Sequence, residues 1–104
     1  MRIFFKPPTA LQAFVNERVE QLRVSSNEEI SKFTEGRTEE ITLASHPATI
    51  YTVSETMPDG RMRVVVQAFT KARLFGSHVA VEGFYRLADG AMVELTKEDY
   101  WEFG

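Results

Sequence analysis

Apolar residues recur at helical spacing in the first quarter of the chain. The stripe that they form consists of Leu11, Phe14, Val15, Val19 and Leu22. Three or four residues separate most of its members, as on one face of an α-helix. Thr9 precedes Gln12 by three residues, which is the spacing of a capping box at a helix start. The pattern therefore predicts a helix from Thr9 to about Val24.

A second, shorter helix is predicted directly behind the first. Ser26 and Glu29 repeat the capping-box spacing, and Ile30 and Phe33 place two apolar side chains three residues apart. These signals predict a helix over 27–35. The alternative for this stretch is an irregular segment.

From Arg37 onward apolar and polar residues alternate with a period of two, which is typical of strands with one buried face. Two Asp-Gly dipeptides, at 59–60 and 89–90, mark turns between such runs, because glycine tolerates a positive φ. A third turn is predicted at 75–76. Short connections make consecutive strands antiparallel neighbours. The predicted strands lie near 39–45, 49–56, 61–73, 78–88 and 91–95.

Two short elements are predicted near the ends of the sequence. An edge strand over 2–6 ends at Pro7-Pro8, because proline cannot donate to a ladder. Thr96, with Asp99 three residues further on, has the spacing of a helix cap and predicts a final helical turn.

Length and composition place the chain in one structural class. Its 104 residues, 43% of them hydrophobic, suffice for one core. We therefore expect residues 1–104 to form a single α+β domain, in which one long N-terminal helix and a short second helix pack on an antiparallel meander of about five strands. The sequence has no cysteine, no apolar run of the roughly 20 residues that cross a bilayer, and no signal-peptide pattern. We expect a cytoplasmic protein with no membrane partner.

Counting outward from the predicted turns gives a strand register. It places Val53 opposite Val64, and Gln67 opposite Phe84. Alternation then divides the sheet into a nearly all-apolar face, which seats the long helix, and a second face with a partly apolar middle and a basic end. The net charge is −3, yet residues 61–86 hold five basic side chains and one acidic one. The candidate binding residues on the second face are Arg63, Gln67, Phe69, Lys71, Arg73, His78, Phe84 and Arg86.

This second face has the composition of a protein interface. Phenylalanine and arginine are enriched in interfaces, and a sheet with apolar residues on both faces lacks one covering layer. A second protomer could supply that layer, as could the tail through Tyr100, Trp101 and Phe103, or the second helix through Ile30 and Phe33. We predict a small non-catalytic interaction or binding domain that acts through this face, as a homodimer or with another protein.

Two other functions stay open. Aromatic side chains on adjacent strands can stack on bases while Arg and Lys contact phosphates, so the face could bind single-stranded nucleic acid, although the acidic net charge disfavours it. A helix across a curved sheet can also enclose a cone-shaped pocket, lined here by Tyr51, Tyr85 and Met92, in a small enzyme or ligand binder. His46 and His78 belong to no recognisable catalytic motif. We therefore assign no catalytic residue, metal ligand or cofactor.

Overall fold

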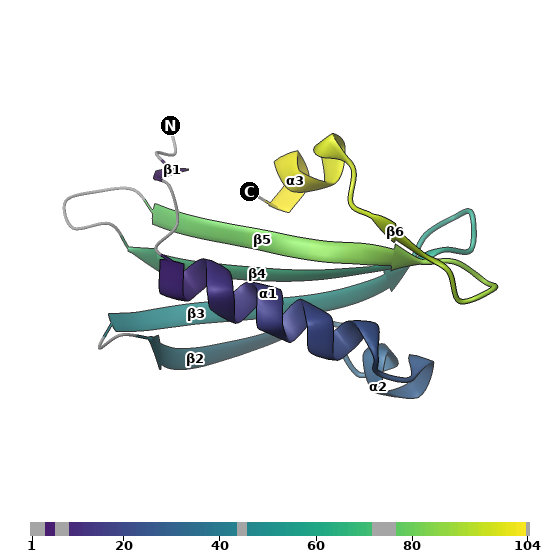
Figure 1. The fold of residues 1–104 in the computed structure, drawn as a ribbon, viewed down its shortest axis with the longest axis horizontal. Helices are drawn as coiled ribbons and strands as arrows, with labels where there is room; N and C mark the ends of the chain where they lie inside the picture. Colours follow the sequence, from purple (N-terminus) through teal and green to yellow (C-terminus); the bar gives the residue numbers. More distant parts are fainter. Residues whose placement is uncertain (1–3, 6–8, 44–45, 72–76, 104) are drawn as a thin grey trace.

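The computed structural model describes residues 4–5, 9–43, 46–71 and 77–103. The predicted α+β fold is confirmed, with a long first helix, a short second helix and an antiparallel meander of five strands in one sheet (Figure 1). The elements in chain order are β1 (Phe4–Phe5), α1 (Thr9–Arg23), α2 (Asn27–Ser31), β2 (Arg37–Leu43), β3 (His46–Thr56), β4 (Met62–Lys71), β5 (Ser77–Arg86), β6 (Met92–Glu94) and α3 (Lys97–Phe103).

The sheet has the order β1-β5-β4-β3-β2, and β6 also pairs with β5. Consecutive strands from β2 to β6 are antiparallel, while β1 joins β5 in parallel. β1 pairs with residues 77–78 and β6 with residues 84–86, so both lie along the outer edge of β5. β2 forms the opposite edge of the sheet (Figure 1).

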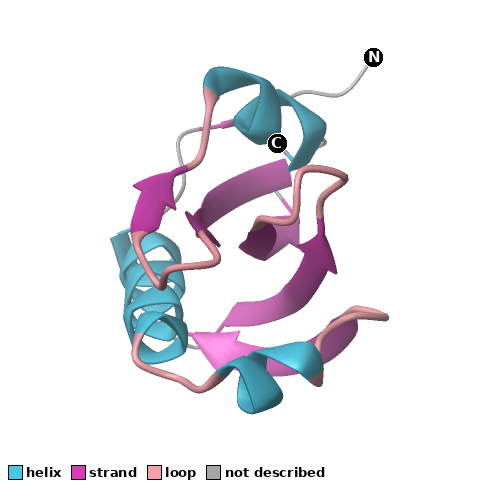
Figure 2. Cartoon of the chain, turned by 90° about the vertical axis from the view of Figure 1, so that its right-hand side faces the viewer, coloured by secondary structure: helices cyan, strands magenta, loops and turns pink. Residues whose placement is uncertain are grey.

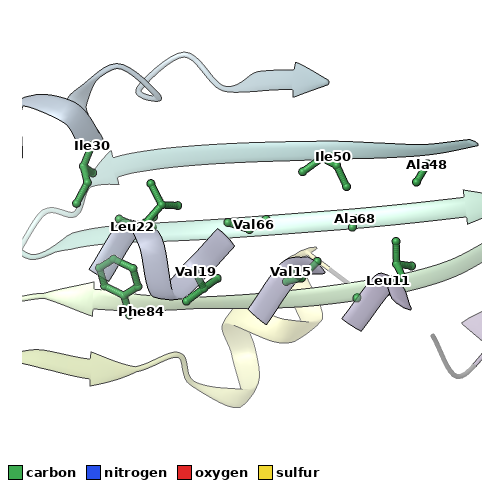
Figure 3. Close-up of a cluster of buried hydrophobic side chains, with 12 residues drawn as sticks. Leu11, Val15, Val19, Leu22, Ile30, Ala48, Ile50, Val66, Ala68 and Phe84 are labelled. Carbon is green, nitrogen blue, oxygen red and sulfur yellow. The ribbon is translucent and has the colours of Figure 1, made fainter. Parts of the chain in front are cut away.

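α1 packs on one face of the sheet through its predicted apolar stripe. Leu11, Val15, Val19 and Leu22 are each at most 5% exposed, and Ile30 of α2 closes the same core (Figure 3). Side chains from three strands complete this cluster, which makes the interface beneath α1 a packed core. We call this side the α1 face; its buried strand residues include Ile50, Val64, Val66, Ala68 and Phe84.

α2 has the predicted capping box but is shorter than predicted. The backbone N–H of Glu29 donates to Ser26 Oγ, and the Glu29 carboxylate accepts in return from the backbone of Ser26. The helix ends at Ser31, and the chain turns at Gly36, where φ is +79°. A Cβ at this position would also collide with the Tyr51 ring, so glycine is required there for two reasons.

α3 covers the second face of the sheet, opposite to α1 (Figure 2). Of the candidates for this covering layer, the tail provides it through Tyr100 and Phe103, whereas Phe33 packs with the α1 core. Trp101 does not take part, since it is 77% exposed. We call this side the α3 face; its apolar residues include Val53, Val65, Val81, Tyr85 and Leu95.

Both Asp-Gly turns are three-residue loops. The N–H of Gly60 donates to Met57 O, and Met57 N donates in turn to Arg61 O. The loop at Gly90 repeats both bonds. Each glycine has a φ near +90°, which fits a turn that ends in a glycine bulge. The lengths of these loops differ from those on which the predicted register relied.

The predicted register is therefore wrong. Val53 lies opposite Val65, one residue from the predicted partner. Gln67 lies opposite Val81, three residues from the predicted partner; the turn predicted at 75–76 lies outside the described residues. Because each offset is an odd number, residues expected on one face are divided between the two.

Thr52 provides a test of core packing. It is fully buried on the α1 face opposite Val66, and its hydroxyl has no hydrogen-bond partner among the described residues. Thr52→Val removes this unsatisfied group while keeping the branched shape, so we expect the free energy of unfolding to rise by about 1 kcal/mol. Urea denaturation measures the change. Thr52→Ser, which keeps the hydroxyl and loses the methyl group, should lower stability, and a destabilised Thr52→Val protein would contradict the argument.

Candidate interaction surface

The predicted binding surface is split between the two faces of the sheet. On the α3 face lie its β4 members Arg63, Gln67 and Phe69. On the α1 face lie its β5 members His78, Phe84 and Arg86, of which Phe84 is fully buried. Lys71 ends β4, and Arg73 lies outside the described residues. The expectation that all of these side chains share one face is wrong, and the register error is the reason.

The same error affects the predicted pocket. Tyr51 and Tyr85, predicted to line a pocket beneath the helix, lie on the α3 face.

Arg63 is a buried cation at the centre of an ionic cluster. Only 4% of its surface is exposed. Its Nη1 donates to Asp99 and Glu102 of α3 at 2.8 Å each, and its Nε donates to Glu55 of β3 at 2.9 Å. The guanidinium also lies 5.0 Å from the centroid of the Phe103 ring. The cluster, which we call the Arg63 cluster, thereby joins β3, β4 and α3.

Asp99 accepts more hydrogen bonds than the ion pair alone. Tyr85 Oη donates to Oδ1 at 2.7 Å, and the backbone N–H and hydroxyl of Thr96 donate to Oδ2. Burial alone would raise the pKa of Asp99, but these donors and Arg63 outweigh it and lower the pKa to about 2. Burial disfavours the charged form of Arg63 as well, which by itself would lower the pKa of this cation. The carboxylates of Glu102, Glu55 and Asp99 outweigh burial and raise the pKa. Both groups are therefore ionised at neutral pH, which suits an ion pair that holds α3 on the sheet rather than a pair that exchanges protons.

Arg86 is bound to the end of α1. Its guanidinium donates to the carbonyl oxygens of Leu22, Arg23 and Ser25 and to Asn27 Oδ1 at distances of 2.8–3.4 Å. The last carbonyls of a helix carry partial negative charge and need donors. This predicted binding residue thus stabilises the junction between α1 and α2.

Glu82 connects the helices on the two faces of the sheet. It accepts from Gln12 of α1 at 3.3 Å and from Tyr100 Oη of α3 at 3.2 Å. Tyr100 must therefore pass around the outer edge of β5, in the stretch between β1 and β6. His78 is four residues from Glu82 on the same strand, which separates their backbones by about 13 Å and rules out a direct acid–base pair.

The two edges of the sheet differ in how they are covered. β1, β6 and Tyr100 occupy the outer edge of β5, whereas no described element lies beyond β2 (Figure 1). Glu39 and Glu40, in the middle of β2, each have a partner in their own chain: Arg18 lies 2.7 Å from Glu39, and Thr49 Oγ1 donates to Glu40. Within the described part of the chain, β2 therefore presents a row of backbone groups without a neighbouring strand.

Comparison of the chain with protein-family models, with curated proteins and with solved structures gives no match. Among the described residues, no group of three or more His, Asp or Glu side chains is placed to hold a metal ion. In the same part of the chain, no helix is both long enough and apolar enough to cross a membrane.

Sequence reasoning singled out Arg63 but missed its partners. Glu55 is eight residues away in sequence, whereas Asp99 and Glu102 are 36 and 39 residues away. The one available signal was the cap formed by Thr96 and Asp99, which placed Asp99 in the first turn of a helix. That signal did not show that its carboxylate would also face the sheet.

Asp99→Asn tests whether the Arg63 cluster holds α3. The folded-state pKa lies below the ordinary value of 3.8, so Asp99 adds stability above about pH 4 that is lost as the pH falls toward 2. We expect the variant to be less stable by about 2 kcal/mol at neutral pH and the difference to shrink between pH 4 and pH 2. Denaturant unfolding at several pH values measures both effects. Asp89→Asn, at an exposed turn, is the control; a difference that stays constant with pH would contradict the role of Asp99.

Tyr100 gives a second test, at alkaline pH. Burial, together with the Glu82 carboxylate, raises its pKa from 10.0 to about 12. A raised folded-state pKa means that the stability supplied by neutral Tyr100 is present below pH 10 and is lost as the pH rises through 12. We expect stability to fall more steeply over this range in the native chain than in Tyr100→Phe, measured by denaturant unfolding. Equal slopes would show that the pKa of Tyr100 is not raised in the folded protein.

Proposed function

We propose that this chain is a non-catalytic protein-interaction domain that forms a homodimer through the free edge of β2. The observation that carries the proposal is the contrast between the two sheet edges. The β5 edge is occupied by β1, β6 and Tyr100, whereas β2 offers a seven-residue edge strand. Strand addition at such an edge is a common mode of protein recognition, in which backbone hydrogen bonds supply much of the affinity. We propose the cytoplasm as its compartment, an expectation that rests on the sequence alone.

A second copy fits this edge by symmetry. Two β2 strands that pair in antiparallel fashion are related by a two-fold axis perpendicular to the sheet, and the two sheets become one. Charged residues on an edge strand usually oppose such pairing. Here the charge of Glu39 is compensated by Arg18, and the oxygens of Glu40 already accept from Thr49. The ion pair with Arg18 reduces the repulsion that two approaching β2 strands would meet at Glu39, and the hydrogen bond from Thr49 holds the Glu40 carboxylate against its own sheet.

Single-stranded nucleic acid is the less favoured partner. Phosphate binding needs accessible cations. Of the predicted phosphate-binding residues, Arg63 is buried among three carboxylates, and Arg86 donates to the end of α1. These contacts support the protein-interaction proposal over the nucleic-acid alternative.

Proline substitution in β2 tests the dimer. Adjacent residues of a strand direct their N–H groups to opposite sides, so one of Glu39→Pro and Glu40→Pro removes a donor to β3 and the other removes a donor at the free edge. We call the variant that loses the donor at the free edge the edge variant. It keeps its hydrogen bonds to β3, so thermal unfolding identifies it as the one with nearly native stability. Light scattering should show a dimer for the native chain and a monomer for this edge variant.

Glu39→Ala and Glu40→Ala are the matched controls, because they remove the same side chains and keep both N–H groups. They should remain dimeric. A native chain that is monomeric at every accessible concentration, or an edge proline variant that stays dimeric, would rule out pairing through β2.

A further inference from the structure

α3 has one side against the sheet and one side in solvent. Tyr100 and Phe103 pack on the α3 face, and Asp99 is buried in the Arg63 cluster. Trp101 lies on the other side of the helix and is 77% exposed. It is the single tryptophan of the chain, and tryptophan is the aromatic side chain that best attracts a cation to its ring face. The outer side of α3 therefore presents a large, mostly exposed ring.

The inner side of the same helix already binds a guanidinium. Arg63 lies over the Phe103 ring and donates to the carboxylates of Asp99 and Glu102. One helix thus supplies both an aromatic ring and carboxylates to a single arginine. Guanidinium groups suit such a site because their planar face stacks on rings while their edge donates to carboxylate oxygens.

The same combination recurs at other arginines of the chain. Three more guanidinium groups lie within 5.2 Å of the centre of an aromatic ring and form an ion pair as well. They are Arg18 with Phe14 and Glu39, Arg23 with Phe84 and Glu94, and Arg61 with Tyr85 and Asp59. A ring beside a carboxylate is therefore the usual setting of an arginine in this fold.

The outer side of α3 offers this setting without an arginine. Glu98 precedes Trp101 by three residues, so the two side chains are neighbours on the helix surface, and both are exposed. Among the cation–π contacts of the described residues, none uses the Trp101 ring. Residues 89–102 contain five carboxylates and one basic residue, Lys97; Asp99 and Glu102 pair with Arg63 and Glu94 pairs with Arg23, whereas no ion pair of Glu98 is found among the described residues. A guanidinium can use the exposed Trp101 ring and the Glu98 carboxylate together, whereas a phosphate group would be repelled by that carboxylate.

We propose that the outer side of α3 binds an arginine side chain from another protein. The incoming guanidinium stacks on the Trp101 indole and pairs with Glu98, as Arg63 does with Phe103 and Glu102 on the inner side. The Arg63 cluster holds the helix in place, so the site is formed before the partner arrives. This surface is independent of the β2 edge, and either proposal can fail without the other.

Trp101 itself reports on the site, because it is the only tryptophan. The probe is a blocked synthetic peptide of alternating arginine and glycine, added to the native chain while the tryptophan fluorescence is recorded. The comparison peptide replaces each arginine by citrulline, which is neutral and has nearly the same shape. We expect a saturable fluorescence change with the arginine peptide that weakens with added salt, and none with the citrulline peptide.

Two charge variants that keep the fluorescent reporter complete the test. Glu98→Gln should weaken binding of the arginine peptide at least about threefold. Glu28→Gln, the same change at an exposed position of α2, should leave binding unchanged. The proposal is overturned if the arginine peptide gives no saturable change, if the citrulline peptide binds equally well, or if both variants weaken binding to the same extent.

Discussion

The placement of α3 depends on the burial of one cation, Arg63. A buried charge costs several kcal/mol unless opposite charges and hydrogen bonds compensate it. Two of its compensating carboxylates, Asp99 and Glu102, belong to α3, so detachment of the helix would break both ion pairs. Seven residues are too few for a stable isolated helix. The ionic cluster and the apolar contacts of Tyr100 and Phe103 therefore keep the second face of the sheet covered.

Internal pairing also explains why three described cations of the basic stretch, Arg61, Arg63 and Arg86, do not form a basic surface. Arg61 pairs with Asp59, Arg63 lies among carboxylates, and Arg86 donates to the carbonyl groups at the end of α1. Each of these residues belongs to the stretch that holds five basic side chains and one acidic one. A charge balance counted along the chain does not show which cations the fold neutralises through residues distant in sequence.

The sequence predicted the elements of this fold well because their signals are local. The Ser26–Glu29 and Thr96–Asp99 caps, the apolar stripe of α1 and the alternation in the strands each depend on residues a few positions apart. The β3–β4 register was wrong because an Asp-Gly dipeptide is compatible with loops of different length. The β4–β5 register was wrong because it was counted from the turn predicted at 75–76. An offset of one or three residues exchanges the faces. The candidate site depended on that register, so Phe84, expected on a surface, lies instead in the core.

The two proposed surfaces lie at different places on the sheet, which has a consequence for how they would act together. β2 is one edge, whereas α3 contacts β5 at the other edge, where Tyr100 reaches Glu82. Pairing of two copies through β2 would therefore leave both α3 helices accessible. A dimer would present two copies of the Trp101 surface, and a partner with two suitably spaced arginine segments would bind it more tightly than either segment alone, because the second contact becomes intramolecular. The two proposed properties, weak recognition of single arginines and dimer formation, would thus complement each other.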